Sequence, residues 1–138
     1  RMVIDETLRL YPPTWILSRV LVGPDKLGDY ELPAGATVAL SPYVTHRHPA
    51  FWPNPESFDP ERFRPEEAER RHKFAYVPFL AGPRQCIGNN FALMEMQIVL
   101  PMILQRFHVS AVPGYPVRPM PKATLRPGPQ VWVEVREK

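Results

Sequence analysis

Two scarcities in this sequence exclude whole classes of protein. With one cysteine among 138 residues, no internal disulfide framework can form. The four histidines do not combine with Cys86 at a spacing typical of a tetrahedral zinc site. Long apolar runs are also missing, because the most apolar stretch, residues 91–104, is short for a membrane span and contains Glu95, Gln97 and Pro101. We therefore expect neither a disulfide scaffold nor a structural zinc protein.

Charge of one sign is scarce too, whereas proline is plentiful. The formal net charge is only +3 and the basic residues are scattered, so the sequence does not favour a nucleic-acid partner. The 19 prolines exceed ordinary usage and are spread among apolar runs, which predicts a loop-rich fold ordered by tertiary contacts. The length suits one domain, but a helical pattern is already under way at Arg1 without a cap. We therefore expect a partial domain of a longer chain.

Periodicity predicts helices and short strands in alternation. Helices are predicted over residues 1–11 and 89–107, the second with a buried or half-buried apolar stripe and with Pro101 as a kink or a break. Residues 41–49 favour a third, short helix. Strands are predicted at residues 15–22, 36–40, 108–112, 123–126 and 131–135. The remaining segments are predicted as turns at 25–30, 32–35 and 65–71, and as a helix-free coil pinned by aromatic side chains at 51–63.

The pair formed by His46 and His48 raises the question of a metal site. Two ligands without a third or a fourth make an incomplete set. A structural or solvated role is therefore the favoured interpretation of both histidines.

The loop around Cys86 carries the strongest indication of chemistry. Cys86 lies between Gly82 and Gly88, two residues after Arg84, and an apolar helix-forming run follows directly. A lone cysteine is more often a buried structural residue. At the start of a helix, however, free N–H groups and the helix dipole favour negative charge, and the glycines permit a sharp turn or a close approach. A flat, anionic metal cofactor with sulfur as its axial ligand would use all of these features.

Three motifs resemble those of the cytochrome P450 family. Its haem-binding signature F-x-x-G-x-R-x-C-x-G is matched by Phe79, Gly82, Arg84, Cys86 and Gly88, and its continuation by Ala92. Glu6-Thr7-Leu8-Arg9 matches the family's E-x-x-R motif, and residues 60–63 match the P-E-R-F box that contains Arg62. The five-residue signature would arise by chance on the order of once in 10⁴ chains of this length or more rarely.

The resemblance implies a fold and a cofactor site. The fold class is mixed α+β: residues 1–138 form one partial domain, the C-terminal haem-binding portion of the mainly helical P450 fold. Cys86 would be the axial ligand of the iron of heme b, shielded by Phe79. Arg84 and Arg19 would neutralise the propionates, although by pattern alone Arg19 could equally be an outward-facing strand residue. The implied cofactor-binding residues are Arg19, Phe79, Gly82, Arg84, Cys86, Ile87, Gly88 and Ala92.

Glu6, Arg9 and Arg62 are a separate, structural expectation. Glu6 and Arg9 are three residues apart on one helix face, and an isolated pair of this kind is usually an exposed ion pair worth roughly 0.5 kcal/mol or less. The resemblance instead implies a buried pair joined by Arg62, and breaking such a pair costs about 3–5 kcal/mol. On this interpretation the three residues brace the cysteine loop and do not touch the substrate.

The function that the resemblance implies is that of an oxidoreductase: a haem-thiolate monooxygenase. It would insert one oxygen atom of O2 into a small lipophilic substrate, with electrons from NAD(P)H through a ferredoxin- or flavodoxin-type partner or a flavoprotein reductase. Basic residues that could steer an acidic partner are Arg62, Arg64, Arg70, Arg71 and Lys73. We expect residues 1–138 to hold the haem ligand but not to catalyse the reaction alone.

Two alternatives stay open. A peroxygenase, isomerase or dehydratase of the same fold would need the same thiolate, and a catalytically silent, truncated remnant would serve at most as an interaction module. Similarity to bacterial members favours a soluble cytoplasmic protein, with membrane anchoring undecided.

Overall fold

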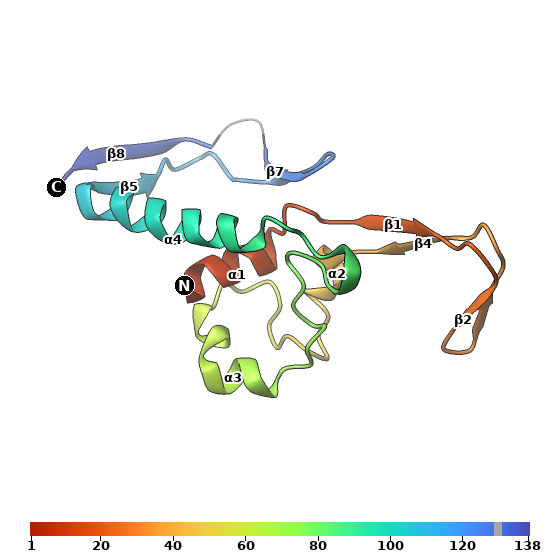
Figure 1. Cartoon of the computed structure of the whole chain (residues 1–138). Coiled ribbons are helices and arrows are strands. Elements are labelled where there is room, and N and C mark those ends of the chain that lie inside the picture. Colours follow the sequence, from red (N-terminus) through yellow and green to blue (C-terminus); the bar gives the residue numbers. More distant parts are fainter. Residues whose placement is uncertain (129–130) are drawn as a thin grey trace.

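Short elements joined by long ordered loops make up this protein (Figure 1). The computed structural model describes residues 1–128 and 131–138. Within these ranges the strands pair only in twos, always antiparallel, beside helices. The mixed α+β class expected from the resemblance is confirmed.

The opening helix α1 (Met2–Leu10) contributes half of the apolar core. Its buried face repeats at helical spacing, and Pro12 and Pro13 follow its end. The buried apolar residues are Ile4, Leu8, Leu10, Trp52, Ala75 and Val77. Charged and polar side chains are buried in the same core, namely Asp5, Glu6, Arg9 and His46. A core this small that contains ionic groups depends on the pairing of those groups.

After α1 the chain forms a hairpin arm that projects to the right in Figure 1. Strand β1 (Leu17–Val20) pairs with β4 (Thr37–Leu40), and both lie within about two residues of the predicted strands. The prediction of a mere turn at residues 25–30 is wrong, because β2 (Asp25–Leu27) and β3 (Tyr30–Leu32) form a second small hairpin. Its two-residue connection needs a positive φ, which Gly28 provides at +59°.

The arm leads into the proline-rich loop region. Helix α2 (Pro42–Thr45) is capped by the Ser41 hydroxyl, which accepts the Val44 N–H at 3.3 Å. The following coil ends in a 3₁₀ turn, η1 (Pro60–Phe63), so the prediction of a helix-free segment is wrong at its last four residues. The aromatic pinning is present, with the Phe63 ring 4.8 Å from that of Tyr76.

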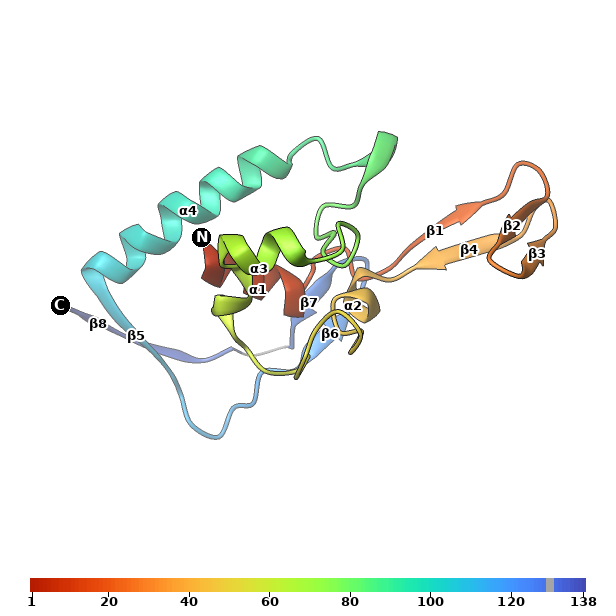
Figure 2. The same ribbon diagram turned by 90° about the horizontal axis from the view of Figure 1, so that it is seen from below.

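Helix α3 (Pro65–Arg70) occupies the segment that was predicted as a solvated turn. The segment is exposed as expected, but the turn assignment is wrong. Proline at the first helical position, acidic residues in the first turn and Arg70 in the last turn complement a helix and its dipole. Figure 2, seen from below, shows α3 in front of α1.

Helix α4 (Asn89–Arg106) lies beside α1 in both ribbon views (Figures 1 and 2). It continues through Pro101, so of the two expected outcomes, a kink or a break, the break is absent. The apolar stripe is half-buried at Leu93 and Met96, but Val99, Leu100, Ile103 and Leu104 are exposed, so the expected burial is wrong for most of it. A hollow of about 460 Å³ lies between α1 and α4, and Val99, Leu100 and Ile103 line it, so these three side chains lack a packing partner on that side.

The C-terminal part is a pair of strand ribbons. Strand β5 (Phe107–Ala111) pairs with β8 (Val133–Glu137), and β6 (Pro119–Pro121) with β7 (Leu125–Pro127). Three of these were predicted within about two residues, and β6 was missed. Among residues 1–128 and 131–138, the search for a helix long and apolar enough to cross a bilayer finds none.

Candidate functional site

The loop that precedes α4 is closed by its own backbone. The Cys86 N–H donates to the Phe79 carbonyl oxygen at 2.9 Å, and a 3₁₀ turn, η2 (Gly82–Arg84), lies between them. Gly82 has a φ of +73°, and Leu80 has a φ of +63°, which is uncommon for a residue with a side chain. The backbone therefore turns sharply twice before Arg84 and then leads to the residues that follow.

Cys86 is exposed and lies just before the N-terminus of α4. Gly88 is the N-cap residue, and a Cβ built on it would lie 3.8 Å from the Cys86 sulfur. The sulfur is thus close to the backbone of the first turn, where the helix dipole favours an anion. The Asn89 N–H donates to the Cys86 carbonyl oxygen at 3.4 Å, and the Asn90 N–H donates to the Asn89 side chain. Ile87, between them, is fully exposed at 102%.

A hollow of about 340 Å³ adjoins the loop on the side of the hairpin arm. Arg19 reaches it from β1 and Arg84 from η2, so the structure brings together two arginines that are 65 positions apart in the sequence. The other walls are mostly apolar and include Leu17, Phe74 and Leu80. The lining residues do not include Phe79, which is half-buried, nor Cys86, Ile87, Gly88 or Ala92.

These residues fit the implied cofactor in their chemistry. A free, exposed sulfur can ligate iron, apolar walls suit the faces of a porphyrin, and two guanidinium groups suit its carboxylates. Among residues 1–128 and 131–138, no cluster of three or more His, Cys, Asp or Glu side chains is placed to hold a bare metal ion.

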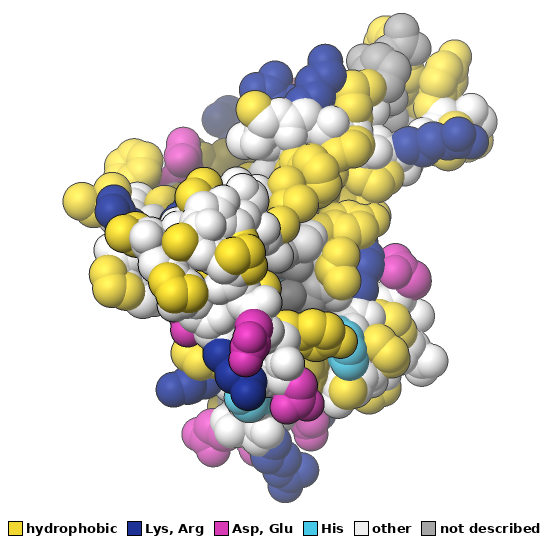
Figure 3. Space-filling view, turned by 90° about the vertical axis from the view of Figure 1, so that its right-hand side faces the viewer, with side chains coloured by type: hydrophobic (Ala, Val, Ile, Leu, Met, Phe, Trp, Pro, Cys, Tyr) yellow, Lys and Arg dark blue, Asp and Glu magenta, His cyan; other side chains and the backbone are white. Residues whose placement is uncertain are grey.

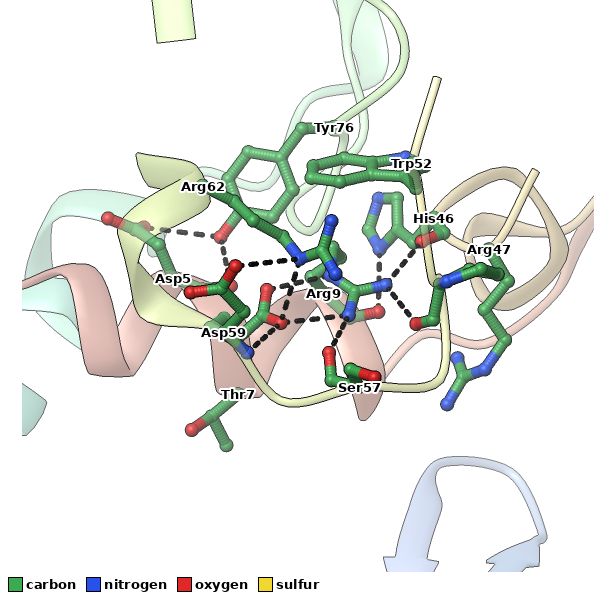
Figure 4. Close-up of polar contacts among 12 residues, drawn as sticks. Asp5, Thr7, Arg9, His46, Arg47, Trp52, Ser57, Asp59, Arg62 and Tyr76 are labelled. Carbon is green, nitrogen blue, oxygen red and sulfur yellow. Dashed lines mark hydrogen bonds and ion pairs between the residues drawn. The ribbon is translucent and has the colours of Figure 1, made fainter. Parts of the chain in front are cut away.

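The three residues predicted as a brace lie together, since Arg9 and Arg62 both approach the Glu6 carboxylate. Figure 4 shows the two arginines side by side. Arg9 and Glu6 are both 0% exposed and pair through two hydrogen bonds, at 2.7 and 2.8 Å. Arg62 approaches from η1, with its Nε 3.6 Å from Glu6 Oε1. The Asp59 N–H donates to the same oxygen at 2.8 Å. The interpretation as an exposed surface pair therefore does not describe Glu6 and Arg9.

Both arginines also bind backbone carbonyl oxygens of the coil. Arg9 donates to the carbonyl oxygens of His46 and Pro55 at 2.8 Å each and to that of Ser57 at 3.1 Å. Arg62 donates to the carbonyl oxygens of residues 53 and 54 at 2.5 and 2.9 Å. The network therefore links α1 to a segment that has few hydrogen bonds of its own.

His46 has a structural role in this core, which is one of the two roles, structural or solvated, expected for both histidines. Its ring is fully buried, with Nδ1 3.1 Å from the Arg9 carbonyl oxygen and Nε2 accepting the Val77 N–H at 2.8 Å. Burial lowers the pKa of His46 from 6.5 to about 4. His48, two residues later, is exposed. The structural interpretation of the pair thus holds for His46, and no sequence signal distinguishes the two histidines.

The basic residues expected to meet a partner divide into two groups. Arg62 is turned into the core, and the half-buried Arg71 stacks on the Trp52 ring at 4.3 Å. Arg64, Arg70 and Lys73 are exposed, and the first two pair with Glu61 and Glu67. In the space-filling view, acidic and basic side chains lie close together in the lower part, whereas hydrophobic and uncharged atoms cover most of the middle (Figure 3).

Comparison with known proteins agrees with the motifs. A family model described as Cytochrome P450 matches residues 1–133. The chain is 42% identical over 138 residues to "Probable cytochrome P450 4aa1" of Drosophila melanogaster, covering 99% of this chain and 27% of that protein. It is 42% identical over 127 residues to "Cyclooctatin synthase" of Streptomyces melanosporofaciens, covering 92% of this chain and 28% of that protein.

Solved structures give the same picture. The cyanobacterial CYP120A1 with bound retinoic acid superposes with a TM-score of 0.94 at 33% identity, over 99% of this chain and 32% of that one. The cytochrome P450DA heme domain superposes with a TM-score of 0.91 at 36% identity, over 99% of this chain and 30% of that one. The chain thus spans roughly a quarter to a third of the proteins that it resembles.

Proposed function

The chain belongs to the cytochrome P450 family, and we propose that it is the C-terminal haem-binding part of a haem-thiolate monooxygenase. The observation that carries this proposal is the exposed sulfur of Cys86, held by a closed loop at the N-terminus of α4. The share of its relatives that the chain spans, about 27%, supports its assignment as one partial domain of a longer enzyme.

In this proposal the chain's residues hold heme b and control the sulfur. Cys86 would ligate the iron through its sulfur, which lies close to the N-terminus of α4. The guanidinium groups of Arg19 and Arg84 neutralise the propionates at the hollow that both line. Phe79 excludes water from the sulfur. When bound, the haem supplies the activation of O2 for insertion of one oxygen atom into a lipophilic substrate.

The remaining implied cofactor residues shape the loop. Gly82 supplies its left-handed turn, and Gly88 lets the backbone pass close to the sulfur. Ile87 precedes the first turn of α4 and is fully exposed, whereas Ala92 is the fourth residue of α4 and is half-buried. We propose that these side chains contact the haem face.

Electrons from NAD(P)H would arrive through an acidic ferredoxin- or flavodoxin-type partner or a flavoprotein reductase. Of the five basic residues considered, Arg64, Arg70 and Lys73 are the exposed ones and are the proposed contacts. If they steer the partner, the rate of haem reduction falls with ionic strength. A rate insensitive to salt would contradict this part of the proposal.

Substitution of Cys86 tests the central claim. In the full-length protein, the reduced, carbon-monoxide-bound form should show the red-shifted Soret band of a thiolate-ligated haem. We expect Cys86→Ser to lose that band, and Gln85→Ala, at the exposed neighbouring position, to keep it. A red-shifted band that survives Cys86→Ser would overturn the proposal, and folded wild-type protein without the band would favour a silent remnant.

A further inference from the structure

The buried ring of His46 joins the ion-pair core to the segment that enters the cysteine loop. Its Nε2 accepts the Val77 N–H at 2.8 Å, so Nε2 is unprotonated and Nδ1 carries the hydrogen. Nδ1 therefore donates to the Arg9 carbonyl oxygen at 3.1 Å. Arg9 returns a hydrogen bond from its guanidinium group to the His46 carbonyl oxygen at 2.8 Å. The imidazole is thus held in one orientation and one tautomer.

Val77 is the last buried residue before the cysteine loop. Its carbonyl oxygen accepts the Leu80 N–H at 3.0 Å, which is the first hydrogen bond of that loop. The Phe79 carbonyl oxygen then accepts the Cys86 N–H at 2.9 Å. A displacement of Val77 is therefore transmitted by two successive backbone hydrogen bonds to the residue that carries the sulfur.

The residues beside Val77 are held in the same way. The Ala75 carbonyl oxygen accepts the Trp52 indole N–H at 3.2 Å. The Tyr76 hydroxyl donates to Asp5, and the Tyr76 ring centroid lies 5.3 Å from that of His46. Three consecutive residues are thus tied to three different parts of the chain.

We propose that His46 is a positioning residue that fixes the base of the cysteine loop against the Glu6–Arg9 pair. This inference rests on the proposed function, because that function makes the Cys86 sulfur in the loop a ligand of the haem iron. Because Nε2 accepts the Val77 N–H at 2.8 Å, the side chain at position 46 must place a neutral hydrogen-bond acceptor where Nε2 lies. Arg9, Arg47 and Tyr76 are the other ionisable groups that face the ring.

Asparagine and glutamine at position 46 distinguish this role from simple core packing. The amide oxygen of glutamine can reach the position of Nε2 and accept the Val77 N–H, whereas the shorter asparagine reaches only the region of Nδ1 and the Arg9 carbonyl oxygen. Both variants remain polar and smaller than or similar to histidine, so both are suited to folding. His48→Asn, at an exposed position, is the matched control.

The test uses the full-length, haem-loaded protein and two measurements. Hydrogen exchange of the Val77 amide should accelerate at least tenfold in His46→Asn, and remain within a few fold of wild type in His46→Gln and His48→Asn. The red-shifted fraction of the reduced carbon monoxide complex should fall in His46→Asn alone. Equal exchange rates and equal spectra for the two position-46 variants would overturn the inference. A wild-type protein without the red-shifted band would instead overturn the proposed function.

Discussion

Replacement of Arg9 by methionine removes the donor on which the loop region depends. The guanidinium group is fully buried and makes five hydrogen bonds, two to the Glu6 carboxylate and one each to the carbonyl oxygens of His46, Pro55 and Ser57. Methionine fills a similar volume but donates nothing. The change therefore tests the polar role of the residue with little change in packing.

The expected cost follows from the groups left behind. Without Arg9, the buried Glu6 carboxylate keeps two partners: the Asp59 N–H, at 2.8 Å from Oε1, and Arg62 Nε, at 3.6 Å from the same oxygen. Removing one partner of a buried pair costs about 3–5 kcal/mol. Each abandoned carbonyl oxygen adds to this, although such costs are not additive. Typical stabilities are about 5–15 kcal/mol, so the loss is a large fraction of the free energy of unfolding.

Chemical denaturation of the haem-loaded protein measures this loss. The matched control is Arg64→Met, because Arg64 is 61% exposed and pairs with an exposed glutamate, so its removal should cost about 0–1 kcal/mol. The double variant Glu6→Leu/Arg9→Met should lose less stability than the sum of the two single losses, since it removes both members of the pair, although Arg62 then keeps only Asp59 as an acidic partner, at 4.0 Å. If Arg9→Met were within about 1 kcal/mol of Arg64→Met, the reasoning would be refuted.

Three further predictions address the loop, the core histidine and the cofactor. Gly82→Val should destabilise the protein by about 1–2 kcal/mol, because φ is +73° at that position. Gly23 has no positive φ and is equally open, so Gly23→Val should cost less. Unfolding in denaturant compares the stabilities of the two variants. Because the pKa of His46 is lowered to about 4 in the folded protein, protonation of the unfolded chain should reduce stability as pH falls from about 6.5 to about 4, by on the order of 3 kcal/mol. Unfolding at a series of pH values checks this, and an equal slope in His46→Gln would contradict it. Replacing Arg19 and Arg84 together by alanine should speed haem loss to an acceptor protein; unchanged haem retention would remove both from the proposed site.

The helices and strands that could be predicted from the sequence are those whose pattern lies within their own residues. The span of α4 follows from its own residues, and the pairing of β1 with β4 follows from two β-rich runs separated by turns. Helix α3 was predicted as a turn although Pro65 and its flanking charges favour a helix, because an exposed helix carries no apolar stripe.

Burial could not be predicted in the same way. The spacing of Glu6 and Arg9 shows that they are neighbours, but their complete burial depends on chain segments about 40–50 residues away that cover them. The side of α4 that carries Val99 and Leu100 shows the reverse case, since its apolar pattern predicted a burial that the described chain does not supply. A helix that is apolar on most sides is usually enclosed by a larger fold, in keeping with the proposed partial domain.

The loop region explains why Arg9 is fully buried among the apolar residues of this core and why Arg62 is half-buried beside it. Its prolines lack N–H groups, and its irregular backbone leaves carbonyl oxygens without the partners that a helix or a sheet would provide. Arg9 and Arg62 together donate to five such oxygens, and Glu6 compensates their charge. The guanidinium groups thus supply these carbonyl oxygens with the hydrogen-bond donors that backbone N–H groups supply in a helix or a sheet. Lysine, with a single nitrogen and no planar fork, could not serve the five acceptors of Arg9, so Arg9→Lys should be nearly as damaging as Arg9→Met.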